Sequence, residues 1–228
     1  AIPAGSPAVD TGDNATCVPD DQRGVTRPAD GNGDGTATCD LGAYELFAPV
    51  VKFASDNSSG QENSSPATID VILASSPVET ATVNYAVSGG NATGGGVDYT
   101  LAAGTLTFAP GDTSESISVT VTNDAVHELN ETVVVALSTP VKAIIGSPSS
   151  HTFTINDNDP APAVSFASGS ASGKESTKTV SVAVTLSAAS GATASVNYAV
   201  TGGSATPGVD LVLASGTLSF TPGQTSKS

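Results

Sequence analysis

The stretch that decides the fold is VNYAVSGGNATGGGVDYTLAAGTLTFAPGDTS, residues 83–114, because the chain contains it twice. VNYAVTGGSATPGVDLVLASGTLSFTPGQTS occupies residues 196–226 and begins 113 residues later. A one-residue deletion in the Gly-rich loop lowers the offset to 112 for the second half of the match. Self-similarity over such a period indicates a repeated structural unit.

The repeat extends upstream of this stretch and sets the domain boundaries that we expect. VKF at residues 51–53 matches VSF at 164–166, and Glu62 matches Glu175, both at the offset of 113. We therefore predict three parts, namely a different N-terminal segment, one complete repeat and a second repeat truncated at the end of the chain. Their expected bounds are 1–47, 48–160 and 161–228.

Apolar residues alternate with polar ones along each repeat, which is the pattern of a strand with one buried face. About seven such runs occur in the first repeat, separated by turns rich in Gly, Pro and Asn, a count typical of a sandwich. The predicted fold is all-β, with antiparallel immunoglobulin-like β-sandwich repeats. The expected strands lie near residues 51–53, 69–73, 83–87, 106–108, 117–121, 133–137 and 153–155.

The composition excludes several classes of partner. The chain has 22 Asp and Glu against 7 Lys and Arg, a formal net charge of −15. Such a charge repels nucleic acid and anionic membranes, because both need a basic surface. No apolar run reaches the roughly 18 residues that a transmembrane helix needs, so we expect no direct membrane insertion.

Acidic residues gather where the predicted strands end. Strands run up and down, so alternate turns share one end of a sandwich, and seven carboxylates can reach the same end. Hard oxygen ligands from several loops suit Ca²⁺, which would also remove the repulsion between like charges. The alternative is that each acid is separately solvated in its loop. The seven residues are Glu62, Asp98, Asp124, Glu128, Glu131, Asp157 and Asp159.

Five landmarks in order make residues 50–160 resemble a Calx-beta domain, and residues 163–228 resemble the start of a second one. They are the early Glu62, GGNATGGGVDYT, GTLTFAPGDTS, NDAVHELNET and the closing TINDNDP. The resemblance implies a calcium-binding module that is not an enzyme. The calcium ligands that it implies are Glu62, Asp98, Asn123, Asp124, Glu128, Glu131, Asp157, Asn158 and Asp159, with Glu175 and Asp210 in the second repeat.

Two of these positions depart from the family pattern. Asn123 and Asn158 are neutral amides where the family's strongest calcium binders carry carboxylates. An amide oxygen still coordinates calcium, but a lower ligand charge reduces the affinity. In the second repeat only Glu175 and Asp210 fall within the chain, so we expect an incomplete site there.

The first 46 residues resemble the tail that ends right-handed parallel β-helices of bacterial surface proteins, through SPA-D-G, DQRG, RP and C-D-x-G-A-Y-E. Cys17 and Cys39 are too few for a zinc site unless histidines join them. We predict that they form a disulfide, which at a loop of roughly 20 residues contributes about 3 kcal/mol and favours an exported protein. Residues 30–35, DGNGDG, open like an EF-hand loop, but Leu41 replaces the required Glu, so a surface turn is favoured.

Catalytic signatures are scarce, with no G-x-S-x-G elbow and no complete phosphate loop. His127 is expected to be a solvated loop residue, and His151 to face solvent. We expect a calcium-binding structural or adhesive region of a secreted, cell-surface bacterial protein, with calcium rigidifying the repeats. Neighbouring domains would bind an extracellular glycan or protein ligand. The alternative is the non-catalytic C-terminal region of a secreted polysaccharide-acting β-helix enzyme.

Overall fold

The computed structural model describes residues 6–42 and 44–228. Residues 1–5 and Ala43, which belong to the predicted segment 1–47, lie outside the described residues. The chain forms two compact units, the first from residues 1–123 and 131–156 and the second from 124–130 and 157–228. Within the described part of the chain, no helix is both long and apolar enough to cross a membrane.

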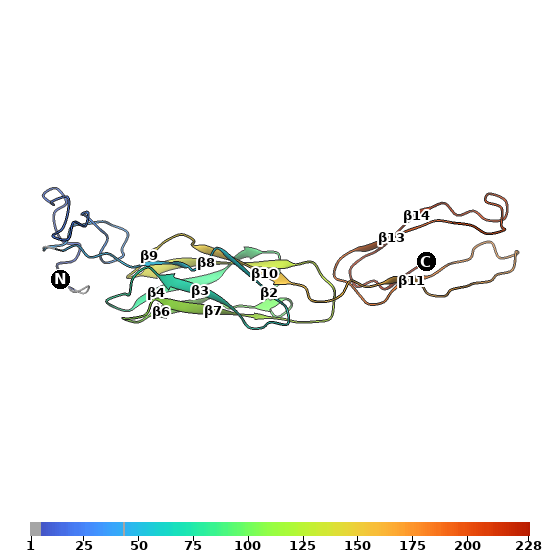
Figure 1. Ribbon diagram of the computed structural model, residues 1–228, viewed down its shortest axis with the longest axis horizontal. Coiled ribbons are helices and arrows are strands. Elements are labelled where there is room, and N and C mark those ends of the chain that lie inside the picture. Colours follow the sequence, from blue (N-terminus) through green and yellow to red (C-terminus); the bar gives the residue numbers. More distant parts are fainter. Residues whose placement is uncertain (1–5, 43) are drawn as a thin grey trace. The chain divides into compact units, whose positions relative to one another are not determined.

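The first unit contains two five-stranded sheets that face each other (Figure 1), so the predicted all-β sandwich is confirmed. One sheet has the order β5 (Tyr99–Thr100), β7 (Ser114–Val121), β3 (Ala67–Leu73), β1 (Val50–Phe53) and β9 (Ile144–Ile145). The other has the order β2 (Asn57–Gln61), β10 (Ser150–Asn156), β8 (Glu131–Val141), β4 (Ala81–Gly90) and β6 (Gly104–Phe108).

The alternation that predicted the strands also builds the core between the sheets. Along β7, Ile117, Val119 and Val121 are buried while Ser118 and Thr120 are exposed. Successive side chains of a strand point to opposite faces, so one face of each strand packs inward. Burying one Val, Ile or Phe side chain contributes about 1.5–3 kcal/mol. The inward faces of the alternating strands therefore form the core together.

Three short strands are additional to those expected, and two of them pair in parallel. β9 pairs with β1 and β2 pairs with β10, both at sheet edges, whereas the other pairings of the first unit are antiparallel. The β2 sequence NSSGQ contains no apolar residue, and β5 and β9 have only two residues each. None of them carries an alternating pattern that sequence analysis can detect.

His151 corrects one expectation, because its side chain is buried and not solvent-facing, with 2% of the residue exposed. Its Nδ1 lies 2.8 Å from the carbonyl oxygen of Ser55, and its Nε2 lies 2.7 Å from Ser58 Oγ. A carbonyl can only accept, so Nδ1 donates to the Ser55 carbonyl oxygen, and in the neutral ring Nε2 accepts from the Ser58 hydroxyl. The ring also packs 5.6 Å from the Phe53 ring. His151 shares the inward face of β10 with Phe153 and Ile155, and Ser58 of the unexpected strand β2 contacts its ring.

The N-terminal segment has little regular structure and is held by polar contacts. Cys17 and Cys39 form the predicted disulfide. The Asp30 carboxylate accepts the backbone amides of Gly33 at 2.6 Å and Gly35 at 2.8 Å, so the DGNGDG stretch is a turn bound by its own amides. Gly33 and Gly35 both have positive φ, which glycine adopts without steric cost.

A buried ion pair ties the ends of this segment together. Arg27 Nε donates to Glu45 Oε2 at 2.7 Å, and Arg27 Nη2 donates to the carbonyl oxygen of Asp40 at 2.6 Å. The second carboxylate oxygen of Glu45 accepts the Ala29 amide at 2.8 Å. Because buried charges are costly unless they are paired and hydrogen-bonded, these contacts specify one arrangement of an otherwise loop-rich segment.

Asp21 occupies a comparable polar site in the same segment. Its carboxylate accepts the side chain of Arg23 at 2.6 Å and the amides of Val25 at 3.0 Å and Glu45 at 3.1 Å. Burial raises the pKa of Asp21, but these hydrogen bonds outweigh burial and hold the pKa well below the ordinary Asp range.

We expect Asp21→Asn to loosen the N-terminal segment in a pH-dependent way. A depressed folded-state pKa means that the carboxylate stabilises the fold fully above about pH 4, the ordinary Asp pKa, and that this stability is lost as the pH falls through the folded-state pKa. Hydrogen-exchange protection of the Val25 and Glu45 amides should therefore drop at pH 7, and the difference from the parent protein should shrink below about pH 4. The exposed Asp13, which accepts the Ala15 amide, provides the control Asp13→Asn. Equal protection in the parent and Asp21→Asn proteins at pH 7 would contradict this role.

The second unit reproduces part of the first sandwich. One sheet has the order β11 (Val164–Phe166), β12 (Val184–Leu186) and β15 (Ser226–Lys227), and the other pairs β13 (Ala194–Tyr198) with β14 (Gly216–Phe220). Thr217 Oγ1 donates to Asn197 Oδ1 at 2.7 Å, as Thr105 Oγ1 donates to Asn84 Oδ1 at 2.7 Å between β6 and β4. The predicted repetition therefore extends to single side-chain contacts.

Residues 124–130 belong to the second unit because its chain binds them. His127 forms a parallel bridge with Ser190. The His127 carbonyl oxygen accepts the Ser190 hydroxyl at 3.0 Å and the Gly191 amide at 2.9 Å. A Cβ atom on Gly191 would lie 2.3 Å from Glu128 Oε1, so only glycine permits this close approach without a shift.

Candidate metal centre

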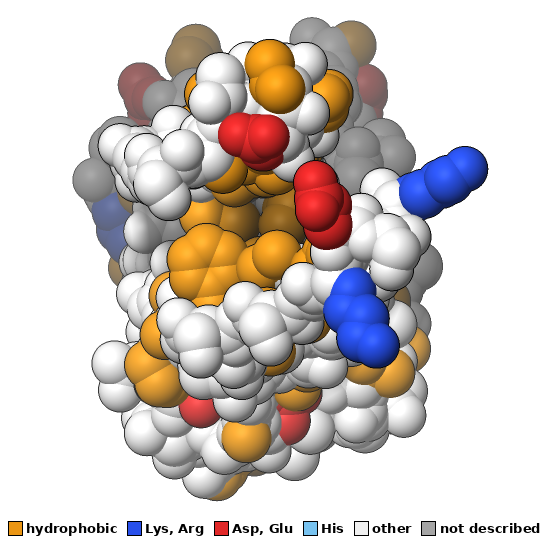
Figure 2. All heavy atoms as spheres, turned by 90° about the vertical axis from the view of Figure 1, so that its right-hand side faces the viewer, with side chains coloured by type: hydrophobic (Ala, Val, Ile, Leu, Met, Phe, Trp, Pro, Cys, Tyr) orange, Lys and Arg blue, Asp and Glu red, His pale blue; other side chains and the backbone are white. Residues whose placement is uncertain are grey.

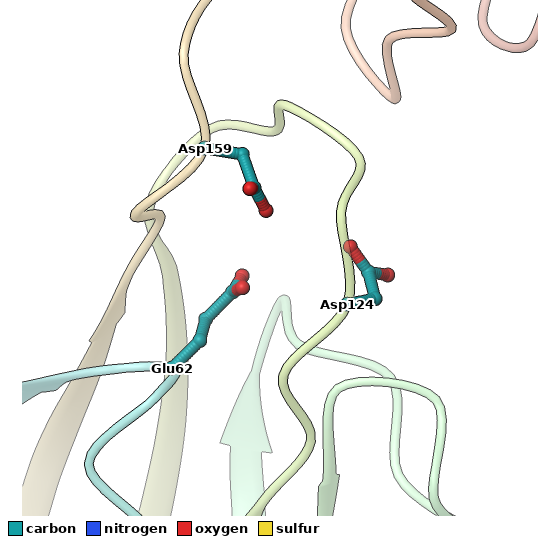
Figure 3. Close-up of side chains that lie close together, drawn as sticks. All are labelled: Glu62, Asp124 and Asp159. Atoms are coloured by element: carbon teal, nitrogen blue, oxygen red, sulfur yellow. The ribbon is translucent and has the colours of Figure 1, made fainter.

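Three carboxylates from distant parts of the sequence point toward one space (Figure 3). One oxygen each of Glu62, Asp124 and Asp159 lies within 4.8 Å of the other two. Glu62 is buried, Asp159 is half-buried and Asp124 is exposed. These three belong to the nine residues predicted as calcium ligands in the first repeat.

The parallel pairing of β2 with β10 places the ligand segments that follow them. Gln61 pairs with Asn156 at the ends of the two strands, and the Glu62 amide donates to the Asn156 carbonyl at 3.1 Å. Parallel strands end on the same side of a sheet, so Glu62 and the residues after Asn156 leave the sheet together. An antiparallel partner would have directed the chain after Gln61 to the opposite end.

The β7–β8 connection supplies Asp124. Its Oδ1 accepts the Val126 amide at 2.7 Å, which is the turn-forming contact that Asp side chains make with the backbone two residues ahead. Asn123 precedes it and is exposed, while Glu128 and Glu131 are half-buried. Glu131 begins β8 and pairs with Ile155 of β10. The acidic stretch is therefore a folded connection between two core strands.

The Asp157 side chain is within hydrogen-bond distance of a histidine side chain. Its Oδ2 lies 2.7 Å from His127 Nδ1, which also lies 3.1 Å from the Asp159 carbonyl oxygen. Both neighbours are acceptors, so Nδ1 carries the hydrogen. The Asp157 amide donates to Asn130 Oδ1 at 3.2 Å. His127 is therefore not the solvated loop residue that was expected, and the sequence offers no signal that it would contact Asp157.

Asp98 and Asp210 occupy the same place in the two repeats. The Asp98 carboxylate accepts the Thr93 amide, and Asp210 Oδ2 accepts the Thr206 amide at 2.9 Å. Each therefore closes its own Gly-rich loop. Glu175 is exposed in a segment without strands. The acidic group formed by the described residues contains neither Asp98, Asp210 nor Glu175. Asn158 follows Asp157 and is half-buried.

The chemistry of the three carboxylates suits a hard divalent cation. Asp159 Oδ2 is buried and has no hydrogen-bond partner among the described residues. A buried charged oxygen is costly unless a hydrogen bond, an opposite charge or a metal satisfies it. Ca²⁺ takes six to eight oxygen ligands and accepts carboxylates with one or both oxygens. The residues present therefore fit a cation, which would supply positive charge between the carboxylates.

We expect Asp124→Asn to raise the Tm of the protein in EDTA by about 1–3 °C, because it removes one of three mutually repelling charges. The amide oxygen of Asn can still accept the Val126 amide, so the turn is retained. Asp112 is the matched control, since its Oδ2 accepts the Ala109 amide at 2.9 Å and it lies outside the acidic group. A lower Tm for Asp124→Asn than for Asp112→Asn in EDTA would contradict this account.

The chain matches a known family model and is similar to several solved structures. The family model of the Calx-beta domain matches residues 47–159 and again residues 157–228. The apo form of the Calx CBD1 domain is 25% identical over 49% of this chain and 98% of that chain, with a TM-score of 0.46. CBD12 from CALX1.2 is 23% identical over 78% of this chain and 73% of that chain, with a TM-score of 0.47. The calcium binding domain CBD12 of CALX1.1 is 23% identical, covers 78% and 72%, and has a TM-score of 0.46. No curated protein matches the chain.

Proposed function

Because this chain belongs to the Calx-beta family, we propose that its first repeat is a calcium-binding structural module and not an enzyme. The observation that carries the proposal is the convergence of Glu62, Asp124 and Asp159, with a buried Asp159 oxygen that lacks a hydrogen-bond partner among the described residues. Carboxylates from three loops are the ligand type that Ca²⁺ prefers.

The proposed ligand set is larger than this central group. It adds neighbours on the same three segments and Asp98, whose carbonyl oxygen accepts the Thr122 amide at 2.9 Å beside the end of β7. The amides Asn123 and Asn158 lower the ligand charge, which favours weaker binding than an all-carboxylate set. The remaining proposed ligands are Glu128, Glu131 and Asp157 in the first repeat and Glu175 and Asp210 in the second repeat.

Isothermal titration calorimetry of the full chain should detect calcium binding with a dissociation constant between roughly 10⁻⁶ and 10⁻³ M. Calcium should also raise the Tm, since a ligand that binds only the folded state stabilises it. We expect Asp159→Asn to weaken binding by about tenfold or more, because it removes ligand charge at the buried oxygen. The control Asp112→Asn should leave the affinity unchanged. If millimolar calcium gives neither heat nor a rise in Tm, the carboxylates are solvated acids and the proposal is wrong.

We further propose that calcium stiffens the connection between the repeats, whose bounds we place at 48–160 and 161–228. Only Pro160, Ala161 and Pro162 separate Asp159 from the start of the second repeat, and prolines restrict the backbone. The Asp157 side chain contacts His127, whose carbonyl oxygen is bound by Ser190 and Gly191. Ligand segments and the second repeat's own chain therefore share contacts, which supports a mechanical role for the ion.

Small-angle scattering of the full chain should show a narrower range of conformations in calcium than in EDTA. The effect should disappear in Asp159→Asn, because that variant removes a ligand without changing the proline linker. Asp112→Asn should respond like the parent protein. The sample is first shown by calorimetry to bind calcium. If its scattering profiles in calcium and in EDTA are then identical, the ion stabilises its own site only and does not stiffen the connection.

We also propose that the region is exported and serves a bacterial cell-surface or adhesive protein. The Cys17–Cys39 disulfide supports an oxidising compartment. An extracellular glycan or protein ligand would bind neighbouring domains. The resemblance of residues 1–47 to a β-helix tail supports a second candidate, the non-catalytic end of a secreted polysaccharide-acting enzyme.

A further inference from the structure

Strand β6 (Gly104–Phe108) forms one edge of its sheet in the first unit and lacks the features that protect such edges. Within the described chain it pairs with β4 on one side, in five consecutive residue pairs without a bulge. An edge strand presents unpaired backbone amides and carbonyls, which another strand can bind, and natural edges are protected by short length, charge, proline or a bulge. The β6 sequence GTLTF has no charge and no proline, and it has the usual length of a strand.

The other three edges of the first unit, at β5, β9 and β2, are protected. β5 and β9 have only two residues each. β2 is as long as β6, but the acidic residues Asp56 and Glu62 flank it directly. Around β6, by contrast, residues 99–111 contain no charged side chain. A further strand that adds to β6 therefore meets no charge from the strand itself or from its flanks.

The net charge of the chain makes this difference important for contact between two copies. Each copy has a formal net charge of −15. Figure 2 shows acidic and basic side chains on one face of the molecule. At physiological ionic strength, exposed charges act over a distance of about 8 Å, so the residues nearest to a contact set the repulsion. Two copies therefore approach each other most readily through a segment that carries no charge, as β6 does.

The β6 sequence is complementary to itself in antiparallel pairing. When Leu106 lies on a two-fold axis, it faces the partner's Leu106, and Thr105 faces the partner's Thr107. Leu106 and Phe108 are buried, whereas Thr105 and Thr107 are exposed. This register keeps the apolar residues of both copies on one face of the sheet and the threonines on the other. Thr–Thr pairs across strands are favourable, and a two-fold contact closes a dimer.

We propose that β6 is a self-association edge, at which two copies of the chain pair antiparallel so that their five-stranded sheets continue into each other. Backbone hydrogen bonds between the two β6 strands supply the attraction, and the facing threonines select the register. One edge of five residues is a small contact, so the dimer is weak and forms in proportion to protein concentration. Such a contact suits molecules that are held close together, because proximity raises their effective concentration.

Sedimentation velocity of the full chain in EDTA, at concentrations up to the millimolar range, tests the proposal independently of the proposed calcium site. We expect a dimer whose fraction rises with concentration. The double variant Thr105→Lys and Thr107→Lys should weaken this dimer about tenfold or more, because lysines of the two copies then face each other. Ser118→Lys with Thr120→Lys is the matched control, since it makes the same charge change at exposed positions of β7, an inner strand. The control should not weaken the dimer.

A charge-swap mixture separates loss of the contact from misfolding of a variant. The double variant Thr105→Glu and Thr107→Glu should also fail to dimerise with itself. Mixed with the lysine variant, it should form a heterodimer, because each lysine then faces a glutamate. A misfolded variant would not regain the contact in this way.

Three results would overturn the proposal. A parent protein that stays monomeric over the whole concentration range would show that β6 binds no second copy. A dimer that is equally strong in the lysine variant and in the β7 control would belong to another surface of the molecule. Lysine and glutamate variants that remain monomeric when mixed would show that β6 does not pair in the two-fold register.

Discussion

The parallel pairing of β2 with β10 is the constraint on which the candidate site depends. Five residue pairs, from Asn57 with Thr152 to Gln61 with Asn156, fix the register of the two strands. A shift of one residue would turn every side chain of β2 to the other face and move Glu62 away from the chain that follows Asn156. The buried His151 strengthens the same register, because its two ring nitrogens bind Ser55 and Ser58 on either side of Asn57. The pairing of β2 with β10 therefore both stabilises the edge of the sheet and places the ligand Glu62.

The sequence predicted the sandwich because its core strands alternate strongly and because the repetition gives each strand a second example. It could not predict β2, whose residues Asn57–Gln61 are all polar or glycine and are recruited only by the edge of β10. His151 was misjudged although it alternates with Phe153 and Ile155, so the strand pattern itself places its side chain on the buried face. Within the site, Glu62, Asp124 and Asp159 were predicted, and the structure brings them together. The contact of His127 with Asp157 depends on the fold of the 124–130 connection and has no signal in sequence.

The sandwich and the N-terminal segment are stabilised by two different kinds of interaction. The sandwich excludes water with Val, Ile and Phe, and its specificity lies in the packing of many weak contacts. The N-terminal segment places Asp21, Arg27 and Glu45 in its interior and satisfies each with a small number of strong, directional bonds. The first kind of core tolerates exchange of one apolar residue for another of similar size. The polar interior of the N-terminal segment does not tolerate such exchanges, because removal of one partner leaves the other charge buried and unpaired, which carries a large desolvation cost.

Near-identity of the repeats has a consequence for how the chain folds. VNY occurs in both β4 and β13, and both strands pair in the same register with a GTL strand, β6 or β14. Each early strand therefore meets two chemically equivalent partners during folding. Ala81 is 27 residues from its native partner Phe108 and 139 residues from Phe220, the equivalent residue of the other repeat. The loop-closure entropy of the longer connection costs about 1.4 kcal/mol more, roughly a tenfold preference for the native partner. Chain connectivity, and not side-chain chemistry, is thus what keeps strands from exchanging between neighbouring repeats.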